Sequence, residues 1–197
     1  FVGFNLWLFG RHGAPAGLEN KVSELGAASF LGLANSAFRG VEYLGLLLLP
    51  LAVALAGAAG RRERFHATVA ILVLGAAALF LYLREGALMP YLTNLIYDLG
   101  LGASSLRDTQ FLGLPPTTHL GRAFALVLTL MATAGAAVLV SAAINGDGLV
   151  GRDPGRCFVA LTAFLLFAGS LLHAGFYFDR YLLPVLPFVV ATLLATH

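Results

Sequence analysis

Charged residues are scarce in this chain. They make up 11% of its 197 residues, whereas 59% of the residues are hydrophobic. Soluble domains carry about 25% charged residues, so this chain lacks the polar side chains needed to cover a surface that faces water. The composition therefore excludes an ordinary soluble domain and predicts a protein that is surrounded by lipid.

Cysteine and lysine are almost absent as well. Cys157 is the single cysteine, so the chain cannot form an internal disulfide, and no Cys or His ligand set of a zinc site accompanies it. Eleven of the 12 basic residues are arginines, mostly scattered rather than gathered in a stripe, which argues against nucleic acid as a partner. The chain also lacks a nucleophile elbow, a phosphate-binding loop and any metal-ligand spacing. Its residues alone therefore indicate no catalytic group, cofactor or metal.

Long charge-free windows are what the sequence has instead. A helix needs about 20 apolar residues to cross a bilayer core of about 30 Å. Five windows of this kind lie near 43–60, 67–83, 123–146, 157–178 and 181–197. They predict an all-α fold, a polytopic transmembrane helix bundle that forms a single domain. Prolines within these windows predict kinks rather than breaks, because neighbouring groups in a bundle can satisfy the freed carbonyls; they are Pro50, Pro184 and Pro187.

Arginine-rich short loops predict the orientation of the spans. The turn 60–66 carries Arg61, Arg62 and Arg64, and Arg152 and Arg156 lie in the connection before the window at 157–178. Lys and Arg in short loops are retained on the cytoplasmic side of a membrane. We therefore expect both connections to be cytoplasmic and the long connection 84–122 to be an extracytoplasmic loop.

The segment before the first window has a different pattern. Residues 18–39 contain apolar side chains at three-residue steps with charged residues among them; the apolar positions are Val22, Leu25, Ala28 and Leu31. This pattern predicts an interfacial amphipathic helix, and a helix packed between the spans is the alternative. The chain begins at Phe1 without an initiator methionine, and both of its ends are apolar. We therefore expect it to be a part of a longer protein.

Polar residues gather in the 84–122 loop. Arg84 and Arg107 are its candidates for binding an anionic group. Apolar residues from Leu88 to Ile96 recur at helical spacing and predict a short helix at the membrane surface. Long loops of this kind are usually functional or disordered, so simple solvation of these polar groups is the alternative.

A second polar cluster is predicted at the last extracytoplasmic turn. His173, Tyr177 and Arg180 follow one another at i, i+4 and i+7, which places them along one face of a continuing helix, and Asp179 adjoins Arg180. The planar guanidinium can bind a phosphate through two parallel hydrogen bonds. The alternative is that the arginine extends to lipid headgroups and the tyrosine belongs to the aromatic belt of the membrane boundary.

Three short motifs resemble a known family. The run 178–187, FDRYLLPVLP, resembles the DRYLLPxLP signature of bacterial membrane glycosyltransferases related to dolichyl-phosphate-mannose protein mannosyltransferases and to lipid A aminoarabinose transferases. Residues 11–15, RHGAP, are similar to the HGxP turn of those proteins, and residues 43–51 resemble their YLGLxLLPL span. The resemblance implies that this chain is the C-terminal part of such an enzyme.

The family takes a sugar from a polyprenyl-phosphate carrier and transfers it outside the cytoplasmic membrane to a lipid, a glycan or a protein. The resemblance thus implies a place in the bacterial inner membrane, with membrane lipids and the polyprenyl-phosphate-linked sugar donor as partners and no cofactor. The family's usual catalytic base is an acidic residue in the first extracytoplasmic loop, and no residue here matches that motif. We expect this part of the enzyme to bind the carrier, with Arg180 as the first candidate. The further candidates are Tyr177, Asp179, Tyr181, Arg84 and Arg107.

Two other functions remain open from the sequence. A membrane transporter or lipid flippase would place ionisable residues at mid-membrane depth to form a pathway. The charge-free windows contain almost none, which argues against ion coupling. A non-catalytic membrane scaffold is the third possibility, since the catalytic base that the family requires is not found in this chain.

Overall fold

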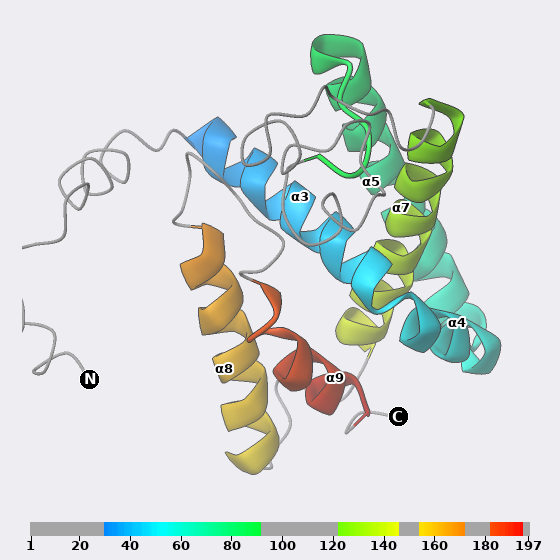
Figure 1. Cartoon of the computed structure of the whole chain (residues 1–197). Coiled ribbons are helices and arrows are strands. Elements are labelled where there is room, and N and C mark those ends of the chain that lie inside the picture. The colour runs from blue at the N-terminus through cyan, green and yellow to red at the C-terminus, as the bar shows by residue number, and fades with distance from the viewer. Residues whose placement is uncertain (1–29, 92–121, 146–153, 172–181, 195–197) are drawn as a thin grey trace, which may run out of the picture.

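The fold is a bundle of α-helices. The computed structural model describes residues 30–91, 122–145, 154–171 and 182–194. Within these ranges the chain forms six helices and no strand (Figure 1). The helices are α3 (Phe30–Leu47), α4 (Leu49–Ala58), α5 (Arg61–Glu85), α7 (Arg122–Asn145), α8 (Pro154–Leu171) and α9 (Leu186–Leu194). The all-helical class expected from the composition is confirmed.

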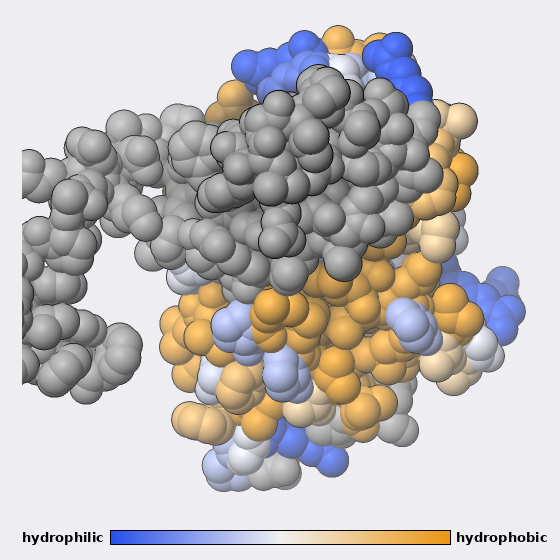
Figure 2. Space-filling view, in the orientation of Figure 1, coloured by the Kyte–Doolittle hydropathy of each residue, from blue (hydrophilic) through white to orange (hydrophobic). Residues whose placement is uncertain are grey.

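Three of these helices are long and apolar enough to cross a membrane: α5, α7 and α8. Many large hydrophobic side chains on them are exposed, including Leu72 and Leu83 on α5 and Phe164 on α8. Figure 2 shows hydrophobic side chains over the middle of the visible face and hydrophilic ones toward its edges. An exposed apolar belt of this kind is stable only against lipid, so the chain is a multi-pass membrane protein.

The first predicted window, 43–60, is not one straight helix. Helices α3 and α4 are long and apolar enough to cross a membrane only when they are taken together. The pair is bent by 78° between Leu47 and Leu49. Pro50 lies at the start of α4, where its missing N–H is tolerated. The expected kink is therefore a break. Pro184 and Pro187 likewise lie at a helix start, because α9 begins at Leu186 after the turn 182–185.

The other predicted windows differ from the observed helices mainly at their ends. Helix α5 begins at Arg61 rather than near residue 67, so the arginine-rich turn forms its first turns, and α7 lies within a residue of the window 123–146. Helix α8 begins at Pro154, and α9 covers the middle of the last window. The rest of the windows 157–178 and 181–197 lies outside the described residues.

The two ends of α5 show why the helix begins and ends where it does. At its start, Glu63 Oε2 accepts a hydrogen bond of 2.6 Å from the Gly60 N–H, which would otherwise lack a partner. At its end, Gly86 adopts a left-handed conformation with φ of 66°, and its N–H donates to Tyr82 O. The short connection 59–60 makes α4 and α5 neighbours along the chain.

Helix α3 lies at the centre of the bundle and crosses α7 (Figure 1). The two backbones meet at Gly45 and Gly135. A Cβ atom added at Gly45 would collide with the backbone of Ala132 and Ala136, and one added at Gly135 would collide with the backbone of Gly45. Small residues permit such close approach where helices associate without a hydrophobic driving force.

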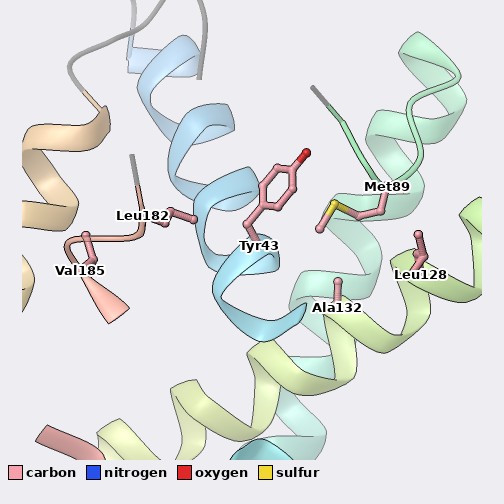
Figure 3. Close-up of a cluster of buried hydrophobic side chains, with 6 residues drawn as sticks. All are labelled: Tyr43, Met89, Leu128, Ala132, Leu182 and Val185. Atoms are coloured by element: carbon pink, nitrogen blue, oxygen red, sulfur yellow. The ribbon is translucent and has the colours of Figure 1, made fainter. Parts of the chain in front are cut away.

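Two hydrophobic clusters hold α3 and α4 in place. Around Tyr43, segments far apart in the sequence converge: Met89 follows α5, Ala132 belongs to α7, and Leu182 precedes α9 (Figure 3). The second cluster joins α4 through Leu48, Ala52 and Leu55 to α7 and α9 through Leu139, Ala142 and Leu193. The α3–α4 pair is thus packed inside the bundle.

The interfacial helix predicted at 18–39 is described only in part. Residues 30–39 belong to α3, which continues without interruption to Leu47. Within this part Arg39 forms an ion pair with Glu85 and the Phe38 ring lies near Tyr91, whereas the side chain of Leu31 is exposed. Residues 18–29 lie outside the described range.

Candidate functional site

Most of the residues predicted to bind substrate cannot be placed. Tyr177, Asp179, Arg180, Tyr181 and Arg107 lie outside the described residues, and so does His173. Arg84 is the exception. It lies in the last turn of α5, with its side chain exposed.

Arg84 borders a groove between α3 and α5. We call this the α3–α5 groove; its volume is about 360 Å³. Its walls are mostly apolar, and on α5 its charged groups lie in the last turn of the helix. The apolar lining comes from Leu31, Ala34, Phe38, Ala77, Phe80 and Leu81, and the polar lining from Asn35, Arg84 and Glu85. A groove of this composition suits a molecule with an apolar chain and a charged head.

An ion pair joins the two helices beside this groove. Arg39 Nη2 on α3 lies 3.1 Å from Glu85 Oε2 on α5. Arg39 also donates from Nε to Asn35 Oδ1 at 3.1 Å, and its guanidinium lies 5.6 Å from the centre of the Tyr91 ring. These three contacts fix the guanidinium in one orientation and neutralise Glu85.

Within the described ranges, the other cations at this end of the bundle are Arg84 and Arg122. The guanidinium of Arg122, the first residue of α7, lies 6.0 Å from the centre of the Tyr82 ring. Arg84 forms no ion pair with any described residue. Of the charged side chains that the structure describes in the groove lining, Glu85 is paired with Arg39 and Arg84 has no ion-pair partner, so Arg84 would attract an anionic head group.

The segment 86–91 returns from the end of α5 into the bundle. The Met89 N–H donates to Thr129 Oγ1 on α7 at 2.8 Å, and the same hydroxyl donates to Ala125 O. The Tyr91 ring lies 6.1 Å from Phe38 and 6.3 Å from Tyr43, both on α3. Burial is the main reason that the pKa of the Tyr91 phenol is raised, so the phenol keeps its proton at neutral pH.

This segment also corrects the short helix expected from Leu88 to Ile96. The chain is not helical from Gly86 through Tyr91. Pro90 has no N–H, and Met89 bonds to Thr129 instead of to its own segment. Residues 92–96 lie outside the described range.

Sequence reasoning missed two charged residues in α3. It assigned Glu42 to the boundary of the first span, and it placed Arg39 at the end of an interfacial helix. In the structure Glu42 is fully buried, and Thr133 Oγ1 lies 3.1 Å from its Oε2 atom. The missed signal is that Arg39 and Glu42 lie within an otherwise uncharged and mostly apolar run from residue 30 to residue 47.

A second cavity lies on the other side of α3. It has a volume of about 240 Å³ and lies among α3, α7, α8 and α9. Its lining is apolar apart from Thr192, whose hydroxyl donates to Phe188 O at 2.7 Å. With no charged or unsatisfied polar group, this cavity has no means to orient a polar ligand.

The described residues contain no group of three His, Cys, Asp or Glu side chains that could hold a metal ion. The α3–α5 groove is lined by apolar side chains together with Asn35, Arg84 and Glu85. No protein-family model matches the chain, and no curated protein or solved structure is significantly similar to it.

Proposed function

We propose that this chain is the carrier-binding part of a glycosyltransferase in the inner membrane of a bacterium. The whole enzyme would move a sugar from a polyprenyl-phosphate carrier to an acceptor on the extracytoplasmic side. The α3–α5 groove would hold the first part of the carrier's apolar chain, and Arg84 would bind its phosphate. The observation that carries the proposal is this pairing of apolar walls with an unneutralised arginine at the groove mouth.

The proposed chemistry follows from the charge at this end of the bundle. Transfer of the sugar leaves a polyprenyl phosphate, on which negative charge develops as the glycosidic bond breaks. Guanidinium groups stabilise such charge, and the apolar walls exclude water that would weaken the attraction. Arg180, in the DRY motif, is proposed as a second phosphate ligand.

The orientation is part of the proposal. In the structure the starts of α5 and α8 lie toward one end of the bundle and Arg84 toward the other (Figure 1). Arginines in the short connections at the first end favour a cytoplasmic location for that end. The mouth of the groove would then face the extracytoplasmic side, where the acceptor is available.

Binding to the protein in lipid nanodiscs tests the proposal. We expect polyprenyl phosphate to bind more tightly than the uncharged polyprenol of the same length. Arg84→Ala should weaken binding of the phosphate by about five- to thirtyfold, because it removes a charge-assisted contact worth about 1 to 2 kcal/mol. Binding of the polyprenol should not change.

Arg61→Ala is the matched control, since Arg61 is an exposed arginine at the opposite end of the same helix. It should leave both affinities unchanged. Equal binding of the phosphate to wild type and Arg84→Ala would show that the α3–α5 groove is not the carrier site.

One observation favours a transporter or flippase as a second candidate. Glu42 is an ionisable residue buried in the bundle, and such residues within membrane segments commonly belong to transport pathways. The structure therefore removes the argument that the spans lack ionisable groups. Movement of a labelled polyprenyl phosphate across proteoliposome membranes, lost in Glu42→Ala but not in Arg84→Ala, would favour transport over glycosyl transfer.

A further inference from the structure

Glu42 occupies an unusual depth for a carboxyl group. Its Oε2 atom lies 3.1 Å from the hydroxyl of Thr133, which is eleven residues from the first residue of α7 and twelve from the last. At about 1.5 Å per residue, Thr133 lies roughly 17 Å from either end of this helix. Glu42 therefore lies beside the middle of a helix that is long and apolar enough to cross a membrane.

Among the residues that the structure describes, no cation neutralises this carboxyl group. Arg39, one turn earlier on α3, is engaged by Glu85, Asn35 and the Tyr91 ring. The other titratable side chains near Glu42 that the structure describes are the phenols of Tyr43 and Tyr91. In the described parts of α4 and α9 there is no titratable side chain, and those of α7 and α8 lie in their first turns. An ionised carboxylate at this position would be buried without a counter-charge, which is very costly.

The hydrogen bonds at Thr133 also indicate that Glu42 is protonated. Its hydroxyl has one proton but two oxygen neighbours, Thr129 O at 2.9 Å and Glu42 Oε2 at 3.1 Å. If the hydroxyl donates to Thr129 O, its lone pairs face Glu42, and the contact with Glu42 is favourable only if Glu42 supplies a proton. Glu42 Oε1 has no hydrogen-bond partner in the described part of the chain, which a neutral carbonyl oxygen tolerates better than a charged carboxylate oxygen does.

We propose that Glu42 is a proton-binding site inside the bundle: at neutral pH it is a carboxylic acid that donates its proton to Thr133 Oγ1. The chain of donors then runs from Glu42 to Thr133 and on to Thr129 O, so each hydroxyl proton has one acceptor. This contact joins α3 to α7 close to the Gly45–Gly135 crossing. The inference does not depend on the proposed glycosyl transfer, because it concerns a different site from the α3–α5 groove.

Infrared spectroscopy of the protein in nanodiscs at neutral pH tests the proposal. The difference spectrum between wild type and Glu42→Gln should show the loss of a carboxylic-acid C=O band. Glu85→Gln is the matched control: its carboxylate is paired with Arg39, so its difference spectrum should show the loss of carboxylate bands alone. Loss of carboxylate bands in Glu42→Gln would overturn the proposal.

A second variant keeps the test decisive if Glu42→Gln does not fold. Thr133→Val removes the acceptor and keeps the shape of the side chain. If Glu42 donates to Thr133, its C=O band should move to higher frequency as the hydrogen bond is lost. An unchanged carboxylic-acid region in Thr133→Val would show that Glu42 does not donate this proton.

Discussion

Substitution of Gly45 by alanine tests the close crossing of α3 and α7 directly. The added methyl carbon would lie 2.8 Å from Ala136 Cα and still closer to the Ala132 carbonyl and the Ala136 nitrogen. All three neighbours are backbone atoms, so no side-chain rotation can relieve the contact, and the two helices must separate.

Two opposing contributions set the change in the free energy of unfolding of Gly45→Ala. Overpacking of a tightly packed contact costs about 1 to 3 kcal/mol and occasionally more. The gain in helix propensity from glycine to alanine is about 0.5 to 1 kcal/mol. Because the collision involves backbone on both helices, we expect the upper end of the first range and a net loss of about 2 kcal/mol in the free energy of unfolding.

Reversible unfolding in mixed micelles of mild detergent and sodium dodecyl sulfate, followed by far-UV circular dichroism, measures this change. Gly75→Ala on α5 is the matched control, because a Cβ atom there would meet nothing within 4 Å. It should be neutral or slightly stabilising. Gly135→Ala should resemble Gly45→Ala, and the double variant should cost less than the sum, since one helix separation relieves both collisions. Equal stability of Gly45→Ala and Gly75→Ala would refute the close crossing.

Three further predictions concern other parts of the chain. Thr129→Val should cost about 1 to 3 kcal/mol in the free energy of unfolding, because it leaves the Met89 N–H buried without an acceptor. Thr68→Val, at an exposed site, should cost little, and an equal effect of the two substitutions would contradict the role of Thr129. In a Cys157→Ser background, a membrane-impermeant thiol reagent on intact cells should label a cysteine placed at Ser104 but not one placed at Glu63, and the reverse pattern would invert the orientation. In the full-length protein, Arg180→Ala should reduce use of the carrier-linked donor roughly tenfold to a hundredfold, and Arg180→Lys should retain only part of the wild-type donor use. Wild-type donor use in Arg180→Lys would indicate an arginine that only reaches the lipid headgroups.

The membrane helices were predictable because they depend on a property that is local in the sequence. Apolar length alone identified the regions of α5 and α7. The 78° bend between α3 and α4 was not predictable from that property, since a charge-free window carries no information about direction. The bend lies between Pro50, at the start of α4, and Gly45, whose close contact with α7 is a long-range contact.

The candidate site was harder to predict for the same reason. Arg84 was found because it ends an apolar window, but its groove is built with α3, which lies some 50 residues earlier in the chain. The ion pair of Arg39 with Glu85 joins residues 46 positions apart. Glu42 was assigned to a boundary because a single charge beside an apolar window usually marks one, and only the packing of Thr133 against it shows otherwise.

The lone thiol of Cys157 has a practical consequence. It is exposed in the first turn of α8, toward the end of the bundle that also holds the start of α5 (Figure 1). A fluorophore or spin label can therefore be attached to the native chain at one defined position. The label would report membrane sidedness without any engineered residue, and paired with a second label near Glu85 it would measure the length of the bundle directly.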